Sequence, residues 1–178
     1  MNNQFTNELN ALQQGAALQV REDAGTLVLA GEDRSDFLQR MTTNDIKRLK
    51  VGQSAVTVLT SPTARTLFVF TVLCRENELW LLPARGETTT LERHLRGNIF
   101  FMDKVSVRNI SNDWHRSRLM GPQSDDVLAQ LLPNGALADD QWQEMAGMVA
   151  VRQQKYDLPG YELLLAAAQE ADLRQRLL

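Results

Sequence analysis

The stretch "LAGEDRSDFLQRMTTNDIKRLKVGQ", residues 29–53, leads from a predicted strand through a helix into a polar segment before the next strand. Phe37, Leu38 and Met41 recur at helical spacing and predict the buried stripe of that helix. Asp33 precedes the stripe, and we expect its carboxylate to cap the helix by accepting backbone N–H bonds. The class of fold depends on the strands and helices that precede and follow this segment.

The polar segment Thr42–Asp45 has two interpretations. Its short side chains can satisfy the last carbonyls of the helix and the amides of the following loop, which is a purely structural role. The same groups present convergent donors and acceptors at the end of a helix, where a polar heterocycle could be bound. The sequence pattern alone does not choose between them.

Strands and helices are interspersed along the chain without strict alternation. Apolar patterning predicts strands at 16–23, 25–31, 54–60, 65–74, 78–84, 104–111, 114–122, 147–156 and 160–167. It predicts helices within 1–15 and at 33–41, 88–98, 124–133 and 169–178. This order favours an α+β fold class, with helices on mostly antiparallel sheets.

The element order divides the chain into parts. We expect an N-terminal helical extension at 1–16, a first α+β subdomain at 17–112 and a second, partial subdomain at 113–178. Asp23-Ala24-Gly25 is interpreted as a hairpin turn between the first two strands. The second subdomain repeats the element order of the first and ends with its last helix. Few residues then remain to close its sheet edge, so we expect a C-terminally truncated architecture.

Composition narrows the class of protein. The formal charge of −3 and the pI near 5.4 favour neither nucleic acid nor an anionic membrane as partner. Cys74 is the single cysteine, which excludes a disulfide framework and a cysteine-based zinc site. The first residues do not resemble a signal peptide, and no run approaches the roughly 20 apolar residues of a membrane span. We expect a cytoplasmic protein.

Few residues suggest catalysis. His94 and His115 have no neighbouring serine elbow or partner cysteine, and no spacing of ligands predicts a metal site. Asp125-Asp126 is interpreted as the first turn of a helix, where carboxylates complement the helix dipole. The basic string 47–50 is either a solvated face or a phosphate grip. No catalytic residue is predicted.

Several motifs together resemble one family. The segment 29–53 resembles the N-terminal signature of the glycine cleavage T-protein superfamily, with its Thr-Thr-Asn-Asp-Ile run. The similarity continues through "LTSPTARTLFVF", "LERHLRGNIFFMDKVSVRNIS" and "RLMGPQSDDVLAQL", and more loosely through "KYDLPGYELLL". The resemblance covers roughly residues 17–178. It implies a folate-binding fold of two related sheet-and-helix subdomains, normally followed by a small β-barrel.

Two branches of that superfamily are relevant. One is the tetrahydrofolate-dependent aminomethyltransferase; the other is the folate-binding branch linked to iron–sulfur protein maintenance and tRNA modification. Phe68 and Val69 stand where the resemblance places the enzyme's essential aspartate, so we expect no aminomethyl transfer. The run "RHLRGNIFFMDKV" is closer to the iron–sulfur branch, although that branch's Lys-Gly-Cys-Tyr-x-Gly-Gln-Glu motif and the barrel are absent.

The resemblance implies three ligand-binding residues for a tetrahydrofolate or related folate. Glu162 matches the family glutamate that accepts hydrogen bonds from the pterin, and Tyr156 could stack on the ring. Asn44 belongs to the polar segment described above, and in this family its role is more often structural. The alternative for Glu162 is an outward-facing residue on an alternating strand.

Three functions follow as hypotheses. The first is a non-catalytic folate-binding protein linked to iron–sulfur protein maintenance or tRNA modification. The second is a tetrahydrofolate-dependent aminomethyltransferase. The third is an interaction module without ligand, in which self-association or another protein covers an exposed edge of the truncated sheet.

Overall fold

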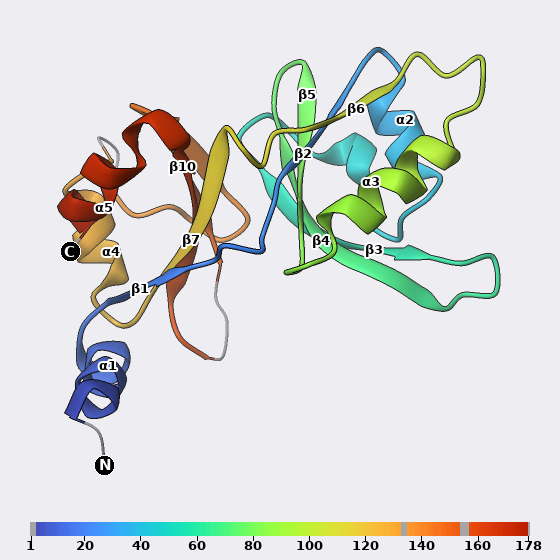
Figure 1. Ribbon diagram of the computed structural model, residues 1–178. Helices are drawn as coiled ribbons and strands as arrows, with labels where there is room; N and C mark the ends of the chain where they lie inside the picture. The colour runs from blue at the N-terminus through green and yellow to red at the C-terminus, as the bar shows by residue number, and fades with distance from the viewer. Residues whose placement is uncertain (1–2, 133–134, 154–156, 178) are drawn as a thin grey trace. The chain divides into compact units, whose positions relative to one another are not determined.

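The computed structural model describes residues 3–132, 135–153 and 157–177. The chain forms two compact units (Figure 1). Unit 1 comprises Met1–Arg21 and His115–Leu178, and unit 2 comprises Glu22–Trp114. Each unit contains one five-stranded sheet and short helices, which confirms the α+β fold class.

Unit 2 is built on a sheet of strand order β3-β4-β5-β2-β6, in which all neighbours are antiparallel. Its strands are β2 (Leu27–Ala30), β3 (Ser54–Thr60), β4 (Thr66–Cys74), β5 (Glu78–Pro83) and β6 (Ser106–Asn109). Its helical elements are α2 (Arg34–Gln39), the 3-10 turn η1 (Ile46–Arg48) and α3 (Thr88–Gly97).

The core of unit 2 lies between its helices and one face of its sheet. Leu27 and Leu29 alternate along β2 and pack in one cluster with Phe37 of α2 and Leu91 and Leu95 of α3. Alternation of side chains along a strand directs these residues to a common face. The expected stripe of α2 is confirmed, since Phe37 is fully buried and Leu38 and Met41 pack against the same cluster.

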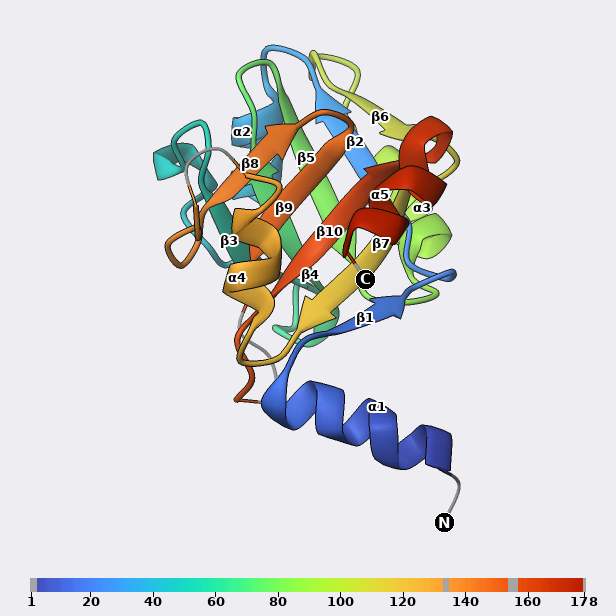
Figure 2. The same cartoon turned by 90° about the vertical axis from the view of Figure 1, so that its left-hand side faces the viewer.

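Unit 1 is built on a sheet of strand order β1-β7-β10-β9-β8. Its strands are β1 (Ala17–Val20), β7 (Trp114–Met120), β8 (Trp142–Met145), β9 (Met148–Arg152) and β10 (Gly160–Ala166). Its helical elements are α1 (Asn3–Gln14), α4 (Ser124–Ala129), the 3-10 turn η2 (Ala167–Gln169) and α5 (Glu170–Leu177). Helices α4 and α5 cover one face of this sheet (Figure 2), where Leu128 and Leu173 pack in a second apolar cluster.

The two units follow one plan. Strand β2 leads into α2, β3, β4, β5 and α3, while β7 leads into α4, β8, β9, β10 and α5. Each sheet places the strands of this series in the same spatial order. The fifth strand differs in origin: β6, which follows α3, lies beside β2, whereas β1, which precedes the whole of unit 2, lies beside β7.

The expected hairpin at Asp23-Ala24-Gly25 is therefore wrong. Strand β1 pairs with β7, with Val20 opposite Ser117, and β2 pairs with β5 and β6. The compact units divide at 21/22 and 114/115, whereas the sequence predicted subdomains at 17–112 and 113–178, and β1 belongs to the sheet of unit 1. We expected few residues to remain for closing the sheet edge of the second subdomain, and in the structure β1 occupies the edge beside β7. Strand β8, Trp142–Met145, lies where the apolar patterning predicted no element.

The carboxylate of Asp33 has a different role from the one expected. Asp33 occupies the position before α2, but its side chain makes no hydrogen bond to the first turn of the helix. It instead accepts a hydrogen bond from the backbone N–H of Lys104 at 2.9 Å. This bond ties the start of α2 to the segment that precedes β6.

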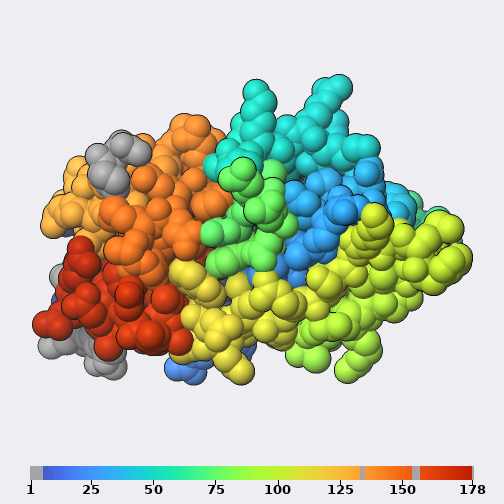
Figure 3. Space-filling view, turned by 90° about the horizontal axis from the view of Figure 1, so that it is seen from above, coloured from blue at the N-terminus to red at the C-terminus, as the bar shows by residue number. Residues whose placement is uncertain are grey.

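The loop between α3 and β6 carries consecutive exposed apolar side chains. Phe100, Phe101 and Met102 are 64%, 98% and 69% exposed. Asp103 fixes the turn by accepting hydrogen bonds from the Phe100 backbone N–H at 2.9 Å and from Arg40 at 2.5 Å. The segment forms the yellow-green end of unit 2 in Figure 3.

Over the described ranges, no helix is both long and apolar enough to span a membrane.

Two glycines make the equivalent strand-to-helix turns of the two units. Gly31 follows β2 at φ +112°, and a Cβ there would lie 2.0 Å from the carbonyl oxygen of Lys104. Gly121 follows β7 at φ +128°, and a Cβ there would lie 2.3 Å from the carbonyl oxygen of Gly15. Only a residue without a side chain permits this positive φ together with such close backbone approach.

We expect Gly31→Ala to lower the free energy of unfolding by about 3 kcal/mol, since it combines an unfavourable φ with a backbone clash. Gly52→Ala is the matched control, because Gly52 also has a positive φ of +88° but no atom lies within 4 Å of its Cβ position. The control should lose about 1 kcal/mol. Urea denaturation measures both, and equal losses would contradict the clash.

Candidate functional site

The side chain of Glu162 lies on the helix-free face of the unit 1 sheet. Its neighbours on β10, Tyr161 and Leu163, pack in the apolar cluster beneath the helices. Because side chains alternate along a strand, Glu162 points to the opposite face. It is nevertheless fully buried, at 0% exposure. A buried carboxylate requires compensating charges or hydrogen bonds.

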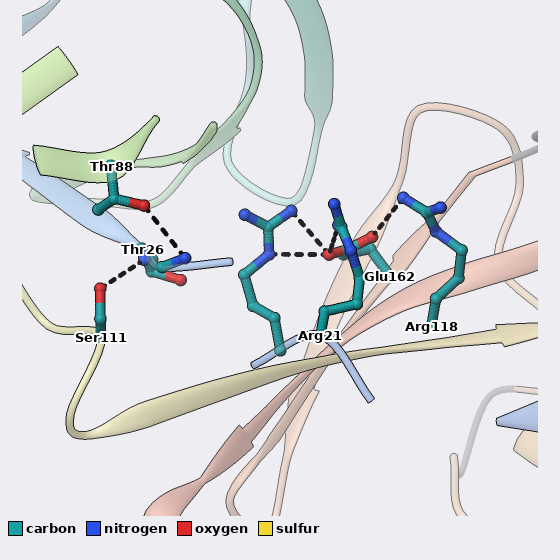
Figure 4. A network of polar contacts seen from close by, with 8 residues as sticks. Arg21, Thr26, Thr88, Ser111, Arg118 and Glu162 are labelled. Atoms are coloured by element: carbon teal, nitrogen blue, oxygen red, sulfur yellow. Dashed lines mark hydrogen bonds and ion pairs between the residues drawn. The ribbon is translucent and has the colours of Figure 1, made fainter. Parts of the chain in front are cut away.

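Three arginines supply that compensation, and Figure 4 labels two of them, Arg21 and Arg118, beside Glu162. Arg21, just after β1, donates from Nη1 to Glu162 Oε1 at 2.5 Å. Arg116 of β7 donates to the same oxygen from Nε and Nη2, both at 2.7 Å. Arg118, two residues further along β7, donates from Nη2 to Oε2 at 3.2 Å. We call Glu162 and these residues the arginine cluster.

The arginine cluster keeps the Glu162 carboxyl ionised. Burial on its own raises the pKa of this group, but the attraction of Arg116, Arg21 and Arg118 outweighs burial and leaves the pKa below its ordinary value. The pKa of Arg116 is lowered, first by burial and further by repulsion from Arg21 and Arg118, against the attraction of Glu162. Arginine nevertheless stays charged at physiological pH.

The structure describes Glu162 but not Tyr156, the two residues predicted to contact a pterin ring. Glu162 is not the outward-facing strand residue of the alternative interpretation. Its role towards a ligand stays a prediction, and its carboxylate already accepts hydrogen bonds from within unit 1. Tyr156 lies outside the described residues. The three arginines were not anticipated, although the i, i+2 spacing of Arg116 and Arg118 in an expected strand was a usable signal.

Asn44 lies in unit 2, between α2 and β3. Its Nδ2 donates to the carbonyl oxygen of Val56 at 2.9 Å, and its Oδ1 accepts from the Asp45 backbone N–H at 2.7 Å. Its own backbone N–H donates to Thr57 Oγ1 at 3.2 Å. These bonds fix the polar segment to strand β3, as in the structural interpretation, and its binding of a ligand stays a prediction.

The two residues at the expected aspartate position face opposite sides of β4. Phe68 belongs to the core of unit 2, and its ring lies 5.7 Å from the imidazole of His94, centre to centre. Val69 is 45% exposed. Neither side chain can accept a hydrogen bond, so this part of unit 2 offers no carboxylate for acid–base or charge-assisted chemistry.

The remaining polar residues of unit 1 form structural contacts. Asp125 lies in the first turn of α4, as expected, and also accepts hydrogen bonds from Tyr161 Oη, at 2.6 Å, and from Arg152. Burial, followed by the bond to Asp125, raises the pKa of Tyr161 to about 12. His115 Nδ1 lies 2.6 Å from Glu170 Oε2 of α5. These contacts attach both helices to the sheet.

The basic string of unit 2 pairs with carboxylates on its surface. Lys47 Nζ lies 2.5 Å from Asp36, and Arg48 Nε lies 3.1 Å from Asp45, with exposed side chains in both pairs. This arrangement is the solvated face of the two interpretations. Within the described ranges, no group of three or more His, Cys, Asp or Glu side chains could hold a metal ion.

The family is decided by a match over the whole chain. The model of the GCVT N-terminal domain matches residues 1–177. The chain belongs to this family. Among solved structures, the glycine cleavage system aminomethyltransferase T of Bartonella henselae superposes on 96% of the chain with a TM-score of 0.86 at 22% identity. The chain covers 47% of that protein, and the likeness confirms the fold of the expected superfamily.

Curated relatives of the domain include bacterial aminomethyltransferases. That of Listeria monocytogenes serotype 4b is 26% identical over 129 residues, which is 70% of this chain and 34% of the relative. That of Halalkalibacterium halodurans is 28% identical over 120 residues, 65% of this chain and 31% of the relative. The chain thus spans about a third of the length of these relatives, so their activity is not transferred to it directly.

We expect Glu162→Ala to lower the free energy of unfolding by about 3–5 kcal/mol, because it leaves three buried guanidinium groups without their shared carboxylate. Glu32→Ala is the control, since the ion pair of Glu32 with Lys104 is exposed. The control should lose less than about 1 kcal/mol. Urea denaturation compares them, and a Glu162→Ala loss as small as that of the control would contradict a stabilising role for the cluster.

The lowered pKa of Glu162 also predicts a pH dependence of stability. A carboxyl whose pKa is lower in the folded state stabilises the protein above its unfolded pKa of about 4.3, and this contribution is lost as the pH falls through the folded pKa. Between pH 5 and pH 3, stability of the unmutated protein should therefore fall more steeply than that of Glu162→Gln. Parallel slopes in urea denaturation across this range would be the contrary result.

Proposed function

We propose that the chain is a folate-binding domain that holds a tetrahydrofolate-like ligand and does not itself transfer an aminomethyl group. The observation that carries the proposal is the buried, ionised carboxylate of Glu162 in a chain of the GCVT N-terminal domain family. The names of the relatives, aminomethyltransferases, support a one-carbon ligand of this class.

The hydrogen bonds to the carboxylate are unevenly shared between its two oxygens. A carboxylate has about four lone-pair positions. Oε1 accepts from Arg21 and Arg116, whereas Oε2 accepts only the 3.2 Å bond from Arg118 among the bonds described. Oε2 is therefore the oxygen that would accept an N–H of a pterin ring. The fixed guanidinium groups would hold it in place for that bond.

Two residues of unit 2 support the part of the proposal that excludes aminomethyl transfer. Phe68 and Val69 occupy the position at which the family resemblance implies an essential aspartate, and neither can orient a reacting amine. In the finer form of the proposal, the domain serves iron–sulfur protein maintenance or tRNA modification, supported by the similarity of 93–105 to that branch. Aminomethyl transfer is the second candidate, since the curated relatives carry that name.

Isothermal titration with tetrahydrofolate under anaerobic conditions tests the proposal. The unmutated protein should bind, and Glu162→Gln should weaken binding by about tenfold or more, the value of one lost charge-assisted hydrogen bond. Glu32→Gln, which removes an exposed carboxylate of unit 2, should leave binding unchanged.

Absence of binding by the unmutated protein would reject the folate ligand. Near-ultraviolet circular dichroism shows whether Glu162→Gln is folded; if it is not, saturation-transfer NMR on the unmutated protein provides a second readout through the pterin protons. Aminomethyl turnover with a lipoylated carrier protein would reject the non-catalytic part and favour the second candidate.

A further inference from the structure

The arginine cluster carries an excess of positive charge. Three guanidinium groups surround one carboxylate, and their side chains are only 9%, 3% and 10% exposed for Arg21, Arg116 and Arg118. Buried charges are stable only when they are paired and hydrogen-bonded. One carboxylate supplies a single negative charge, so the four groups together retain two positive charges.

Arg118 is the least satisfied member of the cluster. Its 3.2 Å bond to Glu162 is longer than the 2.7–2.9 Å typical of charge-assisted N–H···O bonds. Its Nε is buried and has no hydrogen-bond partner within the described ranges. A guanidinium binds oxyanions best through two parallel N–H groups on one edge. Arg118 contributes only one such group to Glu162.

The position of Arg118 differs from that of the paired arginines elsewhere in unit 1. Arg152 meets the carboxylates of both Asp125 and Asp139, and Arg174 meets that of Glu170. Neither arginine shares its carboxylate with another arginine, although Glu170 also contacts His115 and the Nε of Arg174, like that of Arg118, has no hydrogen-bond partner within the described ranges. Arg118 shares its carboxylate with Arg21 and Arg116, which approach the other oxygen more closely.

We propose that the arginine cluster is an oxyanion-binding site, in which the Nε edge of Arg118 takes one oxygen of a phosphate or carboxylate beside Glu162. The oxyanion accepts a hydrogen bond from the Nε–H of Arg118 and neutralises part of the excess positive charge of the cluster. Repulsion among the three guanidinium groups falls as it binds. The site shares Glu162 and Arg118 with the folate site proposed above, but oxyanion binding and its test require no folate.

Inorganic phosphate is the first probe, measured by isothermal titration with chloride held constant. The unmutated protein should bind phosphate, and Arg118→Lys should weaken binding by about tenfold or more, because lysine keeps the charge but lacks the Nε edge. Arg108→Lys is the matched control: Arg108 is an exposed arginine of β6, paired with Glu78, and its change should leave phosphate binding unaltered.

Glu162→Gln separates this site from the folate site. Removing the competing negative charge should strengthen phosphate binding, whereas the same change should weaken tetrahydrofolate binding. The two proposals therefore fail independently, since they predict opposite signs for one variant. If Glu162→Gln does not fold, Arg118→Lys and Arg108→Lys still decide between the outcomes.

A second probe, p-aminobenzoylglutamate, distinguishes the source of the oxyanion. Binding of this fragment with the same dependence on Arg118 indicates a carboxylate ligand, and binding of phosphate alone indicates a phosphorylated one; both support the site. Failure of both probes to bind the unmutated protein would overturn the proposal. Equal binding by the unmutated protein and Arg118→Lys would overturn it as well, because the affinity would then be a general salt effect.

Discussion

The ionised carboxylate of Glu162 is the interaction on which the helix-free face of unit 1 depends. It contacts Arg21 after β1 and Arg116 and Arg118 on β7, while its own backbone belongs to β10. Three neighbouring strands are therefore joined by one anion. Apolar packing could fill the same space, but ion pairs of this kind also fix which residues lie side by side, because a shift in register separates the charges.

The opposite face of the same sheet is held by different forces. Tyr161 and Leu163, on either side of Glu162 in sequence, pack beneath α4 and α5. A single strand thus has an apolar face towards the helices and an ionic face away from them. This division explains how β10, which is nearly continuous in apolar residues, accommodates one acidic side chain without exposing it.

Much of the fold could be predicted from local patterns, because the spacing of apolar residues within a segment indicates whether it forms a strand or a helix. The stripe of α2, the apolar strand β4 and the α+β class belong to this kind. The partner of β1 did not follow. Residues 16–23 and 25–31 both resemble strands, and the intervening Asp23-Ala24-Gly25 resembles a turn. Pairing is decided by tertiary contacts that no local pattern records.

The candidate site shows the same limit more sharply. The alternation along β10 places Glu162 on a different face from Tyr161 and Leu163, but it does not predict whether that face is exposed to solvent or buried. The answer comes from arginines 44, 46 and 141 positions away in the sequence. Asp33 is a related case. Its residue type and its position before α2 are typical of a helix cap, yet its carboxylate accepts a hydrogen bond from the backbone N–H of Lys104.

The origin of β1 has a consequence for synthesis of the chain. Strand β1 is synthesised before unit 2, and it acquires its partner β7 only after about 100 further residues have been made. All strands of unit 2 emerge during that interval, so this unit can complete its sheet while β1 is still unpaired. The nascent chain thus carries β1 without its partner until the strands of unit 2 have been made, and the sheet of unit 1 closes after that of unit 2.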